Sequence, residues 1–224
     1  MKLHGYFRSA ADGRRMSRRT AFGVLLLGAL AAAPIIPGPA AAKSLTVRGI
    51  SFSDELGGFT LDQASGSGTP ADPFVVVETV TGPQHPVLVI RGLSAAFGNL
   101  IGSQHAAGFA MRKIVINHTD HRWLRYQVEL REELNQQSDY GDGLSFDQGS
   151  QNRKEHSDVF AGVQDIDEPF DAIIFSNGEV PIGGKATFEF FVTDSSPVDL
   201  FYLLQEQLDQ VAGDPRRQVA DRRP

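Results

Sequence analysis

The sequence predicts an all-β protein, an antiparallel β-sandwich of the immunoglobulin-like or jelly-roll-like kind, and three observations indicate it. Short runs rich in β-branched and aromatic residues recur along the chain. Clusters of Gly, Pro, Asn and Asp separate these runs, as turns require. Helical periodicity is scarce, apart from a candidate short helix near the C-terminal end. Short strands at such intervals are typical of two packed sheets.

The first half of the predicted domain contains a series of strands. The run 44–52, "SLTVRGISF", alternates as one strand, and a Gly, Ser and Pro loop follows around 66–73. The run 74–80, "FVVVETV", is β-branched throughout, as expected for a strand that is buried on both faces. Further strands are predicted at 86–92 and 109–116. Between them, 93–108 is interpreted as a loop with room for one helical turn.

A polar segment, Asn117 to His121, separates the strand 109–116 from the run that begins at Trp123. Its residues bond readily to their own backbone, so it is interpreted as a reversal between two strands. The following run alternates with period two, which predicts a half-buried antiparallel strand. One face, Leu124, Tyr126, Val128 and Leu130, is assigned to the core, and the other, Trp123, Arg125, Gln127, Glu129 and Arg131, to the solvated side.

The C-terminal part begins with a long polar segment, 135–160, interpreted as an extended loop with room for one short hairpin. The strand 170–180 ends at Asn177-Gly178, which is a hairpin signal. The run 185–194 then alternates, with Ala186, Phe188, Phe190 and Val192 directed inward. The stretch 196–213 fits a helix capped at Ser196 or a closing strand, and a strand followed by a short helix is the preferred interpretation.

The N-terminal residues 1–42 resemble a cleaved export signal rather than part of the fold. Basic residues precede the apolar stretch 21–33, and small residues end the segment at Ala42. Thirteen apolar residues rise only about 20 Å as a helix, which is short for a membrane span of about 30 Å. "SRRTAF", 17–22, resembles a twin-arginine signal, with an ordinary secretory signal and a tilted anchor as alternatives. Cleavage is predicted after Ala42.

The net charge and the absence of cysteine exclude several classes of function for this chain. The chain has 21 basic and 27 acidic residues. Residues 1–42 hold 6 of the basic and 1 of the acidic residues, so 43–224 keeps 15 basic and 26 acidic residues, a net charge of −11. Such a surface repels nucleic acid and anionic lipid. The chain has no cysteine, which excludes disulfides, thiol catalysis and zinc–cysteinate sites. The domain 43–212 must therefore be stabilised by its core, and 213–224 is disordered on composition.

Three stretches together resemble exported bacterial β-sandwich domains, of the kind found in surface proteins with a PEP-type sorting signal. They are "VINHTDHRWLRYQVEL", "FDAIIFSNGEVPIGGKATFEFFVTD" and "FYLLQ", within 113–205. The resemblance implies a non-catalytic role outside the cytoplasm, in the periplasm or beyond the cell. The chain departs from that pattern because it has no C-terminal sorting motif, which puts surface anchoring by that route in doubt.

The candidate binding residues are the aromatics Trp123, Tyr126 and Phe191. Aromatic side chains on a solvated sheet face commonly recognise glycans or proteins. The alternative is that a second sheet or the long loop covers them. The sequence names no partner, and a glycan or an envelope protein is the expected class.

A carbohydrate-active enzyme and a calcium-stabilised adhesion module are the two alternatives to a simple binding module. Glu129 and Glu189 would be the acid pair of a carbohydrate-active sandwich enzyme if their strands were neighbours. Asp139, Asp142 and Asp147 would supply oxygens to calcium in an adhesion module, with Asp165, Asp167, Glu168 and Asp171 as further donors. No cofactor other than calcium is considered. His118 and His121 are interpreted as exposed turn residues rather than ligands of a transition metal.

Overall fold

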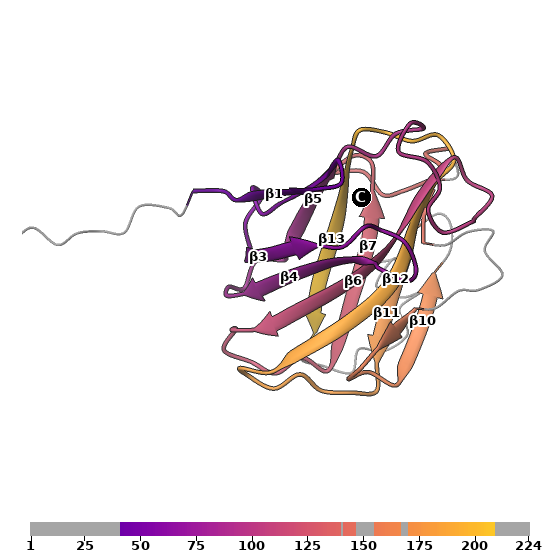
Figure 1. Ribbon diagram of the computed structural model, residues 1–224. Coiled ribbons are helices and arrows are strands. Elements are labelled where there is room, and N and C mark those ends of the chain that lie inside the picture. Colours follow the sequence, from indigo (N-terminus) through magenta and orange to yellow (C-terminus); the bar gives the residue numbers. More distant parts are fainter. Residues whose placement is uncertain (1–40, 140, 147–154, 167–169, 209–224) are drawn as a thin grey trace, which may run out of the picture. The chain divides into compact units, whose positions relative to one another are not determined.

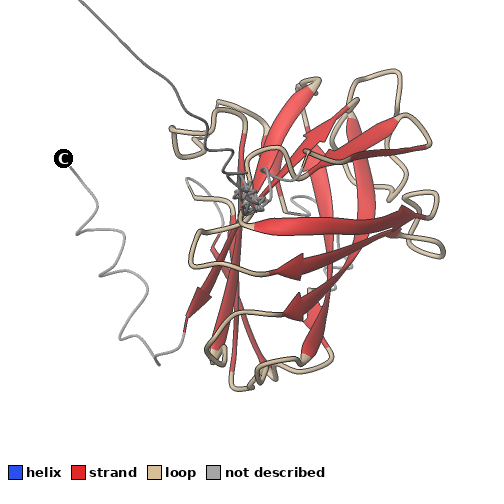
Figure 2. Ribbon diagram, turned by 90° about the vertical axis from the view of Figure 1, so that its left-hand side faces the viewer, coloured by secondary structure: helices blue, strands red, loops and turns tan. Residues whose placement is uncertain are grey.

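The fold consists of two β-sheets packed face to face, and the described residues contain no helix (Figures 1 and 2). The computed structural model describes residues 41–139, 141–146, 155–166 and 170–208. In Figure 1 the strands β3, β4, β6 and β12 form the layer nearer the viewer. The prediction of an all-β sandwich is confirmed. Within the described residues, no helix is long and apolar enough to cross a membrane.

One sheet has seven strands in the order β1-β2-β5-β13-β7-β11-β10, and all its pairs are antiparallel. The closing strand of the chain, β13, lies in its centre, between β5 and β7. The strand bounds are β1 Ser44–Val47, β2 Ile50–Ser53, β5 Val87–Arg91, β7 Arg125–Arg131, β10 Gly162–Ile166, β11 Ala172–Ser176 and β13 Leu200–Leu208.

The other sheet has six strands, in the order β3-β4-β6-β12-β8, with β9 also paired to β12. Its long central pair, β6 and β12, is antiparallel, whereas β4 and β6 are parallel. The strand bounds are β3 Phe59–Ser65, β4 Phe74–Val80, β6 Ala107–Asn117, β8 Leu144–Ser145, β9 His156–Ser157 and β12 Lys185–Asp194.

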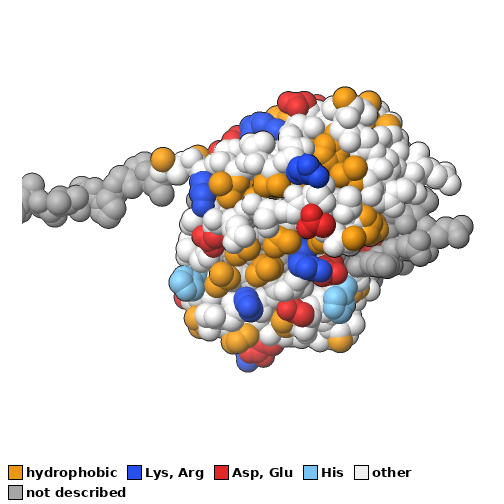
Figure 3. Space-filling view, in the orientation of Figure 1, with side chains coloured by type: hydrophobic (Ala, Val, Ile, Leu, Met, Phe, Trp, Pro, Cys, Tyr) orange, Lys and Arg blue, Asp and Glu red, His pale blue; other side chains and the backbone are white. Residues whose placement is uncertain are grey.

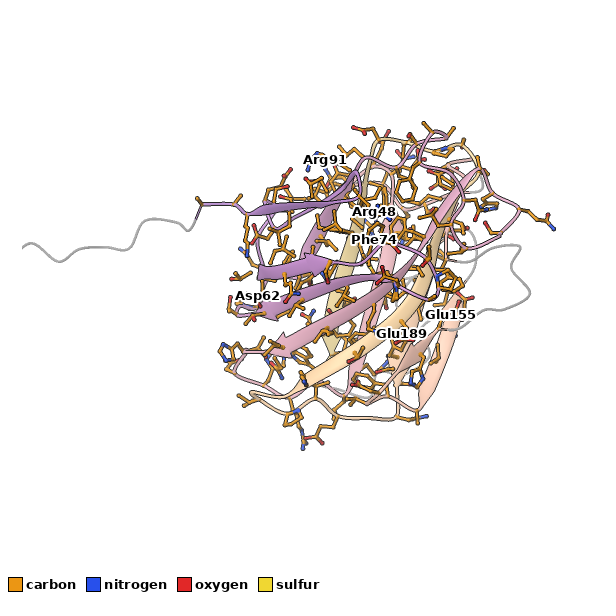
Figure 4. All side chains as sticks on the ribbon, viewed as in Figure 1. Arg48, Asp62, Phe74, Arg91, Glu155 and Glu189 are labelled. Atoms are coloured by element: carbon orange, nitrogen blue, oxygen red, sulfur yellow. The ribbon has the colours of Figure 1, made fainter. Side chains whose placement is uncertain are left out.

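Aromatic side chains from both sheets fill the interior. Phe188 of β12 stacks on Tyr126 of β7 with ring centres 4.4 Å apart, and lies 4.7 Å from the ring of Phe175. A second group is built around Phe74, labelled in Figure 4, which meets Phe52 and Phe109 edge to face. Edge-to-face and offset contacts suit the aromatic quadrupole and add to area burial. The predicted inward set of β12, Ala186, Phe188, Phe190 and Val192, is buried and confirmed.

The run 44–52 is a hairpin, and its prediction as one strand is wrong. Arg48 and Gly49 both have positive φ, 54° and 90°, so they form the two-residue turn between β1 and β2. A pair of positive φ angles matches the twist of the flanking strands. The sequence hides the turn because Arg48 continues the alternating pattern.

The structure differs from the predictions at four other places. The loop predicted around 66–73 is present, but the strand β3 that precedes it and the strand β10 were not predicted. Asn177-Gly178 does not close a hairpin, because β11 and β12 belong to different sheets. Asn177 has a φ of 58°, so this turn carries the chain from one sheet to the other. The strand β4 alternates between buried and partly exposed residues instead of being buried on both faces.

The prediction of a closing strand after residue 196 is confirmed by β13. The expected short helix beyond it, the disordered tail 213–224 and most of the expected export signal lie outside the described residues. In the segment 135–160, β8 and β9 pair with β12 rather than with each other, so no hairpin forms between the described parts of this segment.

Candidate functional site

The polar segment that begins at Asn117 forms a buried hydrogen-bonded turn. Asn117 is fully buried, and its amide donates to the carbonyl oxygens of His121, Val180 and Pro181, at 2.9 to 3.2 Å. Its Oδ1 accepts bonds from the backbone N–H and the hydroxyl of Thr119, at 3.0 and 2.6 Å. This turn therefore holds the start of β7 against the chain at Val180, which forms a bridge with Trp123.

Trp123 and Tyr126 are core residues, so their assignment to a binding surface is wrong. Trp123 is 0% exposed, and its indole N–H donates to Thr119 Oγ1 at 3.2 Å. It precedes β7, so the alternation of that strand does not fix where its side chain points. Tyr126 is also 0% exposed and lies on the core side of β7 with Val128 and Leu130, as the period-two pattern predicts. Of the three aromatics, Phe191 alone is partly exposed.

Glu129 and Glu189 cannot form a catalytic pair, because their strands belong to different sheets. Each lies on the outer side of its own sheet and is bound by arginine. Arg131 Nε lies 2.6 Å from Glu129 Oε1, and Arg112 Nε lies 2.7 Å from Glu189 Oε1. Glu129 borders a hollow of about 90 Å³, which has room for a few waters, whereas ligand sites usually span roughly 300–1,000 Å³.

The candidate calcium residues Asp139 and Asp142 act as turn formers. Asp139 Oδ1 accepts the N–H of Gly141 at 2.7 Å, and Asp142 Oδ1 accepts the N–H of Leu144 at 3.0 Å. Asp147 lies outside the described residues. Of the further acids, Asp171 accepts the hydroxyl of Ser138 at 2.6 Å. The described residues hold no group of three or more side chains suited to a metal ion. His118 is exposed, and His121 bonds to Asp120.

Glu132 lies among these acids, and its pKa is raised to about 7. Burial is the main cause, followed by the negative charges of Asp142, Asp194 and other nearby acids. One carboxylate oxygen of Glu132 is enclosed and has no hydrogen-bond partner within the described residues. Because the folded state holds this proton more tightly than the unfolded state, the residue destabilises the fold increasingly as the pH rises from about 4.5 to 7.

Replacing Glu132 by glutamine is therefore expected to stabilise the protein only at neutral and alkaline pH. The gain should be about 1–2 kcal/mol at pH 8, after allowance for solvent screening, and close to zero near pH 4.5. Urea denaturation across this pH range measures it. The exposed neighbour variant Glu133→Gln is the control and should change stability less. A gain that is equal at all pH values would contradict the titration.

The outer side of the six-stranded sheet carries partly exposed apolar side chains that point to a partner. Its outward side chains are apolar over much of β4 and β6, and we call the set Val75, Val77, Ile114, Ile116 and Phe191 the outer apolar face. All five are partly exposed. Figure 3 shows apolar side chains across this side of the molecule, interrupted by charged ones.

Strand pairing places the outer apolar face on adjacent strands. Val77 of β4 is directly opposite Ile114 of β6, and β12 lies beside β6 on its other edge. The ion pair Arg112–Glu189 spans β6 and β12 within this face; Glu189 is labelled in Figure 4. Of this set, only Phe191 is among the candidate binding residues predicted from the sequence. The β-branched runs of β4 and β6 resemble strands that are buried on both faces. The structure shows instead that their outward side chains are left partly exposed by the described residues.

The fold and this surface define an all-β sandwich with an exposed apolar sheet face. No family model, no curated protein and no solved structure matches the chain. The resemblance of 113–205 to exported sandwich domains thus stays an expectation from the residues.

Proposed function

We propose that this chain is an exported, non-catalytic β-sandwich module that binds a protein partner at the cell envelope or outside the cell. The observation that carries the proposal is the outer apolar face, a set of partly exposed Val, Ile and Phe side chains on the neighbouring strands β4, β6 and β12. Apolar side chains that gather on one exposed face, with polar residues among and around them, often mark a protein interaction site. Export is supported by the character of residues 1–42, where basic residues precede a short apolar stretch and small residues.

A protein partner fits this surface better than a glycan does. Glycan sites use aromatic rings as platforms, and Phe191 is the sole aromatic in the outer apolar face. Aliphatic side chains around an ion pair resemble the mixed apolar and polar composition of protein interfaces. The net charge of −11 in 43–224 favours a partner with a basic rim around its contact patch.

The substitution Ile114→Glu tests the proposal, because it places a charge in the centre of the outer apolar face. Binding of an envelope protein, measured by affinity capture and then with the purified partner, should weaken at least about tenfold. The matched control is Ile182→Glu, since Ile182 is 61% exposed in the segment between β11 and β12. The control should bind like the unmodified protein, and both variants should keep the melting temperature within a few degrees.

Other outcomes would overturn the proposal. Equal binding by both variants would remove the outer apolar face as the site. A glycan that binds the unmodified chain but not the Ile114→Glu variant would replace the protein partner. A dimer that dissociates only in that variant would make the face an interface between two copies. Recovery of the protein in the cytoplasm with Met1 retained would contradict export.

A further inference from the structure

Four polar side chains meet in the interior between the two sheets. Glu78 of β4 and Lys113 of β6 come from the six-stranded sheet, and Tyr126 of β7 and Gln205 of β13 come from the seven-stranded sheet. Each is 0–1% exposed. Lys113 Nζ contacts Glu78 Oε1, Gln205 Nε2 donates to Glu78 Oε2 at 3.0 Å, and the hydroxyl of Tyr126 donates to Gln205 Oε1.

The environment of Lys113 is unfavourable for an ammonium ion. Its Nζ lies 5.9 Å from the ring centre of Phe59, and within the described residues it has no partner other than Glu78. Burial is the main cause that lowers the pKa of Lys113, against the opposing effect of Glu78. A buried ion pair with unsatisfied donors loses much of its attraction to desolvation. Burial therefore favours the neutral form of the Lys113 amine, which is the nucleophilic form.

We propose that Lys113 and Gln205 join in an isopeptide bond across the two sheets, with Glu78 as proton carrier and Tyr126 as donor to the carbonyl oxygen. The carboxylate of Glu78 touches both the amine and the amide nitrogen, so one group can serve both proton transfers. Glu78 thus brings the amine and the amide to one point in the buried interior, and a fixed arrangement of this kind favours reaction between them.

The reaction balances without any co-reactant. Glu78 takes one proton from the ammonium of Lys113, and the neutral Nζ attacks Cδ of Gln205. The hydroxyl of Tyr126 stabilises the negative charge that develops on Oε1. Glu78 delivers its proton to the amide nitrogen and takes a second proton from Nζ. The Cδ–Nε2 bond then breaks and ammonia leaves, so the products are the isopeptide, ammonia and a neutral Glu78.

The bond would do for this chain what a disulfide does for other exported domains. The chain has no cysteine, and Lys113 and Gln205 lie on central strands of opposite sheets. A covalent link between them ties the two layers at the core and constrains the unfolded chain. It also removes two opposite charges from the interior, because every product group there is neutral.

Mass spectrometry of the purified, denatured protein tests the proposal directly. We expect an intact mass about 17 Da below that calculated for the same termini, which is the loss of one ammonia. Trypsin should release a linked pair of peptides, 113–122 and 186–216, because a modified Lys113 is not cleaved. Fragmentation should place the link between Lys113 and Gln205.

Other mass-spectrometric results would contradict the proposed bond or its assignment. An unchanged intact mass overturns the proposal. A loss of about 18 Da, with the link between Lys113 and Glu78, shows loss of water and overturns the role of Gln205. A link to Gln207, the other amide on this side of β13, overturns the assignment as well. The variant Glu78→Gln should restore the full mass, whereas Lys185→Met, which removes an exposed lysine, should not. If Glu78→Gln fails to fold, the mass of the unmodified protein alone decides.

Discussion

Replacing Lys113 by methionine should destabilise the protein by about 3–5 kcal/mol, because the substitution removes the proposed link to Gln205 and leaves Glu78 buried without its lysine partner. Glu78 is 0% exposed and keeps only the amide of Gln205 as a partner. Methionine fills similar space, so a cavity contributes little to this loss. Guanidinium denaturation at pH 7 measures the free energy of unfolding, and the exposed Lys185→Met variant controls for the loss of a lysine.

The double variant, Lys113→Met with Glu78→Gln, separates the cost of the unpaired charge from every other effect. Neither variant can form the proposed isopeptide bond, so a comparison between them is independent of that bond. The double variant should be more stable than the single one by about 3 kcal/mol, because a neutral amide needs no cation. Equal stability of the two variants would show that the carboxylate is already protonated or reached by water.

Local patterns predicted much of the fold, because buried and exposed side chains alternate along a half-buried strand with a period of two residues. The core sides of β7 and β12 followed directly from that alternation. Two predictions failed where a residue lies just outside a regular strand. Trp123 precedes β7, so its direction is set by the hydrogen bond to Thr119 rather than by the pleat. Arg48 keeps the alternating pattern although its positive φ turns the chain.

The pairing between distant strands was not predictable from the sequence. Glu129 and Glu189 have similar local patterns, and only the order of the strands shows that they lie on opposite sides of the molecule. Lys113 illustrates the same limit. It occurs in an apolar run where a lysine normally lies on the solvated side, but β6 turns it inward toward Glu78 of the neighbouring strand β4. A residue's partner depends on long-range contacts, and these carry no local signal.

The polar segment after β6 was predicted as a reversal, and the structure shows which hydrogen bonds form it. The reversal was predicted from the preference of Asn, Thr and Asp for turns. The structure adds that Asn117 uses its amide group fully, with three carbonyl acceptors and two donors from Thr119. Since its side chain is buried, water cannot replace any of these bonds. Asn117 therefore joins the ends of β6 and β7 to the segment before β12.

The substitution Asn117→Asp should consequently destabilise the protein by about 3–5 kcal/mol at pH 7, although the two side chains have nearly the same shape. Aspartate cannot donate to the carbonyls of Val180 and Pro181, and it brings a buried negative charge close to them. Urea denaturation measures the loss, and Asn135→Asp at an exposed position should change stability by less than about 0.5 kcal/mol. Because burial makes this carboxyl hold its proton more tightly than in the unfolded chain, the part of the penalty that comes from the charge should shrink as the pH falls from 7 toward about 4. A loss that does not depend on pH would attribute the effect to the missing donors alone, and a loss under about 1 kcal/mol would show that this turn does not need the amide.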